Sequence, residues 1–77
     1  NGKHRFTVNG LTPLDEFNTY FKSSITNPDF ETIGGVIMNA FGDMPNRGDE
    51  VEVEKISFKI LNVDKRRIHS LQILLGN

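Results

Sequence analysis

The spacing of apolar residues predicts an amphipathic helix in the middle of the chain. Within residues 29–49 the apolar positions recur at steps of three and four, which places them on one face of a helix. These positions are Ile33, Val36, Ile37, Ala40, Phe41 and Met44. Thr32 precedes them as an N-cap, Gly42 can adopt the left-handed conformation after the last turn, and Pro45 stops the helix. The start, the face and the stop therefore agree on one helix between Thr32 and Gly42.

A shorter helix is predicted ahead of the central one. Thr12 is placed as an N-cap, Pro13 as the first helical residue and Asp15 as an acid in the first turn. Apolar residues follow at helical spacing: Leu14, Phe17 and Phe21, with Tyr20 beside them. We therefore expect a helix over about residues 13–21. A polar loop then leads to Phe30, an apolar anchor for the start of the central helix.

Alternating apolar and polar residues predict four strands. The segments are 4–8, 50–54, 56–63 and 68–75, separated by turn signals that include Asn9-Gly10, Glu54-Lys55 and Asp64-Lys65-Arg66. The alternation slips at Ile60-Leu61, which predicts a bulge or a strong twist in the third segment. The fold class is therefore α+β: a small antiparallel sheet with a C-terminal β-meander, packed against two helices.

The composition fits one small domain held together by packing alone. The chain has 77 residues with 36% hydrophobic residues, and it contains no cysteine for a disulfide or a thiolate metal site. Nine basic and ten acidic residues leave a net charge of −1, which gives no general attraction to nucleic acid or to an anionic membrane. No apolar run approaches the ~20 residues of a bilayer span, and no signal-peptide pattern is present.

Five pieces of the sequence occur in an order that resembles a known family. They are Val8-Asn9-Gly10, Leu14-Asp15-Glu16-Phe17, Asp29-Phe30-Glu31-Thr32-Ile33-Gly34-Gly35, Pro45-Asn46-Arg47-Gly48-Asp49 and Asp64-Lys65-Arg66-Arg67-Ile68. On this set the chain resembles the CorC/HlyC transporter-associated domain, the C-terminal domain of magnesium and cobalt efflux proteins and of hemolysin-like CBS proteins. No single piece is specific, but the ordered set is. Asn9 stands where the family often has an acid, and Gly34 where it often has Ala.

The resemblance implies an accessory domain and not an enzyme. In the family this domain usually follows a pair of CBS domains, often with a membrane domain ahead of them, and it is thought to modulate ion transport. We therefore expect residues 1–77 to be one cytoplasmic domain from the C-terminal end of a larger protein, at the cell membrane or wholly cytosolic. The start at Asn1 in place of Met agrees with this expectation. Expected partners are the CBS domains, a membrane domain of the same parent and a second copy, but no nucleic acid.

The paired glycines in the first turn of the central helix need a reason, because each costs about 1 kcal/mol relative to Ala. Either another backbone packs closely there, or an anion binds the helix start, with Thr32, Gly34 and Gly35 as candidate cofactor-binding residues. The alternative function is therefore a nucleotide- or flavin-binding domain. FAD enters only because the family's fold resembles that of FAD-binding domains of some oxidoreductases. Without a G-x-x-x-x-G-K-[ST] or G-x-G-x-x-G motif, close packing is favoured and no cofactor is expected.

Acidic residues after the central helix are candidate ligands for Mg²⁺ or Co²⁺: Asp49, Glu50, Glu52 and Glu54. Hard cations prefer oxygen ligands, so a weak ion-sensing patch could form there. The favoured interpretation is a solvated strand face, with Lys59 on the next strand as a pairing cation.

The remaining charged residues indicate no catalytic set. Lys65-Arg66-Arg67 is a basic run at a predicted hairpin, and it lacks the interleaved aromatic residues of a nucleic-acid surface. A solvated turn is the default, with contact to a partner domain or an anionic lipid surface as the alternative. His4 and His69 are far apart and lack H-x-x-x-H spacing, so each is expected to be an ordinary strand residue.

Overall fold

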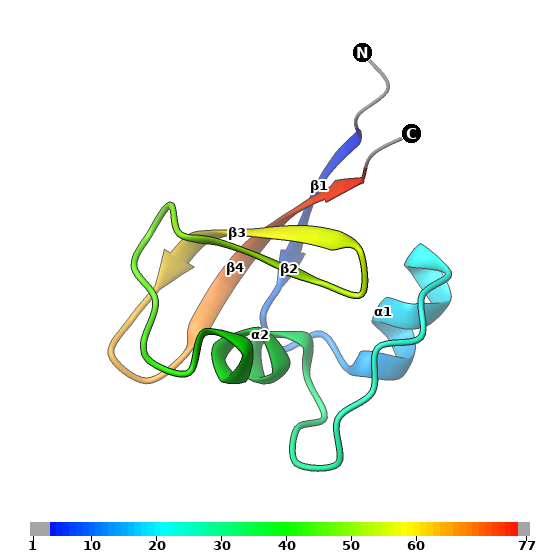
Figure 1. Ribbon diagram of the computed structural model, residues 1–77, viewed down its shortest axis with the longest axis horizontal. Coiled ribbons are helices and arrows are strands. Elements are labelled where there is room, and N and C mark those ends of the chain that lie inside the picture. The colour runs from blue at the N-terminus through cyan, green and yellow to red at the C-terminus, as the bar shows by residue number, and fades with distance from the viewer. Residues whose placement is uncertain (1–3, 76–77) are drawn as a thin grey trace.

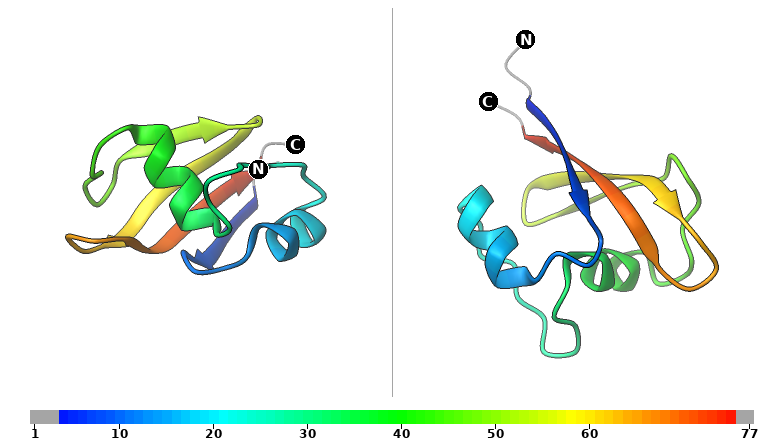
Figure 2. Two further views of the ribbon diagram at one scale, coloured as in Figure 1. Left: turned by 90° about the horizontal axis from the view of Figure 1, so that it is seen from below. Right: turned by 180° about the vertical axis from the view of Figure 1, so that it is seen from behind.

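Four strands form one antiparallel sheet and two helices lie against one of its faces, as the computed structural model shows for residues 4–75 (Figure 1, Figure 2). The elements in chain order are β1 (His4–Asn9), α1 (Leu14–Phe21), α2 (Ile33–Phe41), β2 (Glu50–Val53), β3 (Ile56–Val63) and β4 (Ile68–Leu75). The strand order in the sheet is β1-β4-β3-β2. The α+β class and the C-terminal meander are confirmed.

The core lies between the helices and the apolar face of the sheet. Phe6 is opposite Ile73 in register, and Ile73 is opposite Phe58, so these side chains share one face. Among the described residues no polar or charged side chain is buried, and the core consists of Phe17, Ile25, Ile33, Val36, Ile37, Ile56, Phe58, Ile60, Ile68, Leu71 and Ile73. Burial of apolar surface, at roughly 25 cal/mol per Å², is therefore the main stabilising term.

α2 begins and ends at the residues that the sequence predicts. The Thr32 hydroxyl accepts from Gly35 N–H at 3.2 Å, and Gly42 closes the helix at φ +76°. The predicted apolar face is wrong at its far end, because Ala40 is exposed and Met44 is 38% exposed. Ala40 sits in the last turn, past the residues that pack on the sheet, and Met44 lies beyond the end of the helix.

α1 begins at Leu14 without the side-chain cap that the sequence predicts. The N-cap is Pro13, so the assignments of Thr12 as N-cap and of Pro13 as first helical residue are wrong. Leu14 N–H instead donates to Glu31 O at 2.8 Å, in an isolated bridge that joins the starts of the two helices. A backbone carbonyl from another segment therefore accepts a hydrogen bond from the first turn of α1, in place of a cap hydroxyl.

The loop between the helices contributes a core residue that the polar pattern does not reveal. Ile25 is 2% exposed and is held there by the side chain of Asn18. Asn18 Nδ2 donates to Ile25 O at 2.7 Å, and Ile25 N–H donates to Asn18 Oδ1 at 3.0 Å. The loop therefore packs under α1 and is not only a solvated connection.

The turns and the irregularity of the sheet agree with the sequence. Glu54 and Lys55 have positive φ angles of 53° and 68°, which is the backbone of a tight, primed hairpin turn. The register of β3 against β4 shifts between Ile60 and Asn62, at the predicted bulge. Across residues 4–75, neither helix is long and apolar enough to cross a membrane.

Candidate functional site

The start of α2, which carries the candidate cofactor-binding residues Thr32, Gly34 and Gly35, has its backbone donors engaged within the fold. The bonds are Ile33 N–H to Thr12 O (2.9 Å), Gly34 N–H to Gly10 O (2.8 Å), Gly35 N–H to Thr32 Oγ1 (3.2 Å) and Val36 N–H to Thr32 O (3.2 Å). An anion at this helix end would therefore find these four N–H groups already in use. The nucleotide- or flavin-binding hypothesis stays a prediction. The N–H groups of residues 33–36 are bonded within the fold and do not supply donors for a phosphate.

Close packing accounts for both glycines of the pair. A Cβ on Gly34 would lie 2.6 Å from Gly10 O, and a Cβ on Gly35 would lie 2.8 Å from the ring of Phe30. Gly10 is equally confined, because a Cβ there would overlap the Ile68 carbonyl. The glycines let the turn after β1 pass directly under the first turn of α2.

The candidate cation ligands Asp49, Glu50, Glu52 and Glu54 lie along one exposed edge of the sheet. Glu50 is opposite Lys59 in register, so the expected pairing cation stands next to it. Asp49 Oδ2 accepts from Asn46 N–H at 2.8 Å, which engages one ligand in its own turn. Within the described part of the chain, no three His, Asp or Glu side chains gather closely enough to hold a metal ion. The cation site stays a prediction.

The hairpin between β3 and β4 is organised by Asp64. Its Oδ1 accepts from the N–H groups of Arg66 (2.7 Å) and Arg67 (2.9 Å), and its Oδ2 accepts from His69 Nε2 at 2.6 Å. These bonds hold the pKa of the Asp64 carboxyl well below its usual value, and the bond from Arg66 N–H has the largest effect. His69 is a residue of β4, as predicted, and its side chain also bonds to the hairpin turn, a role that the sequence did not indicate.

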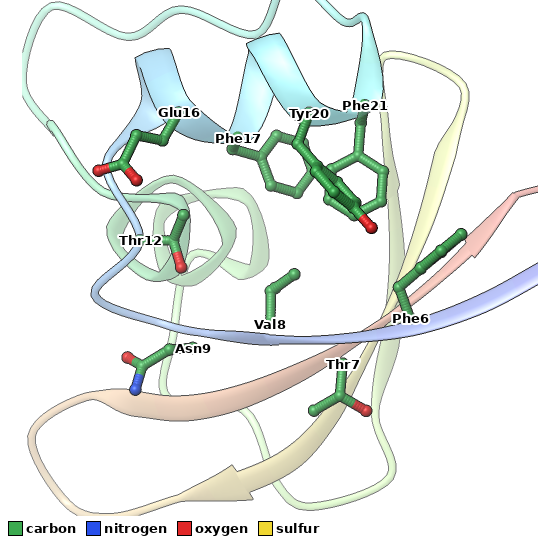
Figure 3. Close-up of a pocket in the computed structure, with 9 residues that line it drawn as sticks. All are labelled: Phe6, Thr7, Val8, Asn9, Thr12, Glu16, Phe17, Tyr20 and Phe21. Atoms are coloured by element: carbon green, nitrogen blue, oxygen red, sulfur yellow. The ribbon is translucent and has the colours of Figure 1, made fainter.

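Sequence reasoning missed a groove between β1 and α1 (Figure 3). It has a volume of about 400 Å³ and is lined by Phe6, Thr7, Val8, Asn9, Thr12, Glu16, Phe17, Tyr20 and Phe21. Tyr20 is 70% exposed, although its ring packs edge-on against the ring of Phe6 with 6.2 Å between the two ring centroids. An exposed aromatic beside an apolar hollow is typical of a binding surface. Periodicity placed the residues of each wall but could not bring the two walls together.

A second, smaller hollow of about 220 Å³ lies between the start of α2 and the basic hairpin. Leu11, which is 57% exposed, lines it together with Phe30 and Met38, and Arg66 and Arg67 lie at the same hollow. The basic run of the hairpin therefore borders apolar surface.

Comparison with known proteins agrees with this architecture. The family model described as "Transporter associated domain", CorC_HlyC, matches residues 1–76. The magnesium and cobalt efflux protein CorC of Pasteurella multocida is 41% identical over 71 residues, which cover 92% of this chain and 24% of that protein. The chain thus spans about a quarter of the length of the curated relatives that it matches.

Solved structures share the fold. The CorC_HlyC domain from Haemophilus ducreyi superimposes with a TM-score of 0.84 at 25% identity, over 100% of this chain and 94% of that one. The transporter associated domain of a CBS domain protein from Porphyromonas gingivalis gives 0.76 at 23% identity, over 99% and 91% of the two chains. A Xylella fastidiosa hemolysin domain in complex with Mg²⁺ and Mn²⁺ gives 0.78 at 22% identity, over 95% and 87%.

A two-layer α+β domain with these surfaces and these relatives belongs to a class of domains that accompany transporters. The chain is a member of the CorC_HlyC family of transporter-associated domains. The resemblance carried by the five ordered motifs is confirmed.

Proposed function

We propose that this chain is a non-catalytic regulatory domain of a magnesium and cobalt efflux protein, acting through contacts with other domains of the same parent. The family match over residues 1–76, with curated relatives about four times as long, carries the proposal. The proposed partners are CBS domains, a membrane domain where the parent has one, and a second copy. The Porphyromonas gingivalis relative, which comes from a CBS domain protein, supports the first of these. We place the domain in the cytoplasm.

Regulation by such a domain would work through a shift of conformational populations. A transporter alternates between states, and a domain that docks more tightly to one of them raises its population. A difference of about 1.4 kcal/mol between the two docked states changes their ratio tenfold. Exposed apolar residues such as Tyr20 and Leu11 give the domain surface with which to dock.

Deletion of this domain from its parent tests the proposal. We expect cells that carry the shortened parent to differ in growth at high Mg²⁺ or Co²⁺ from cells with the full protein. Immunoblots must show equal amounts of both proteins, and a parent with Thr26→Ala in an exposed loop serves as the control. Unchanged tolerance of Mg²⁺ and Co²⁺ together with unchanged assembly of the parent would refute the proposal.

Direct binding of a divalent cation is the second candidate, because the Xylella fastidiosa relative was solved with Mg²⁺ and Mn²⁺. The proposed ligands are the acids Asp49, Glu50, Glu52 and Glu54. A titration of the amide NMR spectrum with Mg²⁺ would then shift the signals of residues 49–54, and Glu52→Gln would weaken the response. Glu31→Gln, an exposed acid elsewhere, is the matched control. Equal titration curves for the two variants would rule this site out.

A further inference from the structure

The groove between β1 and α1 runs beside an open edge of the sheet. β1 is first in the order β1-β4-β3-β2, so among the described strands it has a neighbour on one side only. β1 forms one wall of the groove and α1 the other, with side chains from both directed into the space between them (Figure 3). A chain that reached this edge would meet main-chain groups and apolar surface together.

The hydrogen-bond pattern shows which main-chain groups of β1 face outward. Gly10 N–H donates to His69 O at 2.8 Å, and this pair continues the register of β1 against β4. Alternate residues of an antiparallel strand bond to the neighbouring strand. By this alternation Val8 and Phe6, which are in phase with Gly10, bond to β4. Arg5 and Thr7 lie between them and turn their N–H and C=O groups to the open edge. Each of these two residues offers one donor and one acceptor to an added strand.

The opposite edge of the sheet is less suited to strand addition. Ile60 N–H donates to Asp49 O at 2.9 Å, so by the same alternation Glu50 and Glu52 turn their main-chain groups outward on β2. Their carboxylates stand along that edge, and charged side chains on an edge strand oppose pairing. β2 is also shorter, with four residues against six in β1.

The lining of the groove selects the chemistry of a partner. Of the nine lining residues, Glu16 is the one that carries charge at neutral pH. It lies at the end of the groove near Thr12, whereas Phe6 lies at the other end (Figure 3). Val8 and Tyr20 present apolar surface between them. A cation is therefore favoured at one end and apolar side chains along the rest.

We infer that β1 and α1 bind an extended segment of protein chain, which adds to β1 as a fifth, antiparallel strand. The inference rests on the proposed function, since it names a surface for domain contact. In this strand the residues opposite Val8 and Phe6 point into the groove, because opposed side chains of a ladder share a face. In the added strand, the residue opposite Val8 comes two positions before the residue opposite Phe6. The residue two positions earlier still reaches the end of the groove at Glu16. The segment is thus a Lys or Arg followed by apolar residues two and four positions later.

A labelled peptide tests this inference directly. The probe is the heptapeptide Thr-Lys-Thr-Val-Thr-Val-Thr, with binding to the 77-residue chain followed by fluorescence anisotropy and by amide NMR. We expect saturable binding that shifts the signals of Arg5, Thr7 and Tyr20 but not those of residues 50–53. Methylation of the peptide nitrogen opposite Thr7 should weaken binding about tenfold. A peptide with Glu in place of Lys should bind about fivefold more weakly, and Glu16→Lys should reverse that preference.

Matched proline variants separate the two edges. Thr7→Pro removes an outward N–H from β1, and Glu52→Pro removes one from β2. We expect the first to weaken peptide binding about tenfold and the second to leave it unchanged, with both folds checked by circular dichroism. If Thr7→Pro does not fold, the methylated peptide supplies the same test. Equal affinity for the methylated and unmodified peptides overturns the inference, and so does a dimer through β1 that excludes the peptide.

This inference and the proposed function fail in different ways. Peptide binding at β1, combined with unchanged ion tolerance and unchanged assembly of the parent after domain deletion, supports the groove and overturns the regulatory role. Altered tolerance after deletion combined with no peptide binding supports the regulatory role and overturns the groove.

Discussion

At the scale of single residues, two glycines join the start of α2 to the sheet. Gly34 N–H donates to Gly10 O, and Gly10 N–H donates to His69 O, each at 2.8 Å. One main-chain path therefore runs from α2 through the turn after β1 into β4. Neither glycine has room for a side chain, so both allow this close approach of main chains.

Gly10→Ala is expected to lower the free energy of unfolding by about 2–4 kcal/mol, because the new Cβ overlaps the Ile68 carbonyl and a backbone must move. Urea denaturation followed by circular dichroism measures the change. Gly35→Ala is the comparison, with a smaller expected loss of about 1 kcal/mol, since its new Cβ would meet the side chain of Phe30 and not a backbone atom. Equal stability of Gly10→Ala and the unsubstituted chain would contradict the observed contact.

Asp64 makes the stability of the domain depend on acid pH. Hydrogen bonds from Arg66 N–H, His69 and Arg67 N–H hold its pKa in the folded state below the ordinary 3.8. Between the folded and unfolded pKa values the unfolded chain binds more protons, so stability rises with pH there. The contribution is fully present above the unfolded value and is lost as pH falls through the folded one. We expect the stability difference between the unsubstituted chain and Asp64→Asn to be larger at pH 7 than at pH 2.

Urea denaturation at both pH values measures this difference. His69→Ala removes one of the three donors, so Asp64→Asn should show a smaller difference between the two pH values in that background. The same stability difference at pH 7 and pH 2 would show that the hairpin does not retain a charged Asp64 on acidification.

At the scale of elements, local patterns place the helices and strands, and distant contacts decide some of their ends. α2 starts at Thr32 and stops at Gly42 because its own residues serve as caps. The start of α1 was mispredicted because Leu14 N–H is bound by Glu31 O, a partner from another segment that leaves no mark near Thr12. The loop between the helices was predicted as polar for the same reason. Its one core residue, Ile25, is held by a side chain on α1.

Asn18→Ala is expected to lower the free energy of unfolding by about 2 kcal/mol, because it removes both bonds to the Ile25 backbone and one from the Ser23 hydroxyl. Amide hydrogen exchange should also quicken at residues 23–25. Thr19→Ala is the control, with an expected loss within about 0.5 kcal/mol, since its hydroxyl donates to Asp15 O at an exposed position. Similar losses in the two variants would mean that Asn18 does not anchor the loop.

At the scale of the whole molecule, the β1–α1 groove depends on the pairing of the first strand with the last. Phe6 and Val8 are predictable as one face of a strand, and Phe17 as part of one face of a helix. What brings them together is the pairing of β1 with β4, which places β1 at the edge of the sheet under α1. Alternation fixes the face of a strand but not its neighbour, so the fold class was predictable and this surface was not.

A circular permutant tests that strand order. His4 lies opposite Leu75, so joining Asn77 to Asn1 leaves the five residues 76–77 and 1–3 between β4 and β1. Hairpin loops commonly have up to about this length. New ends between Thr26 and Asn27 fall in the loop that connects the helices. We expect this permutant to fold with a free energy of unfolding within about 2 kcal/mol of the original chain.

The permutant opened between Glu54 and Lys55 is the matched comparison. It contains the same new junction but cuts the tight turn that sets the register of β2 against β3. Because the register of a hairpin is fixed by its turn, this permutant should be the less stable of the two in urea denaturation. If neither permutant folds, the shared junction is not tolerated, and β1 is then not adjacent to β4 in solution. The groove would then lose the strand that forms one of its walls.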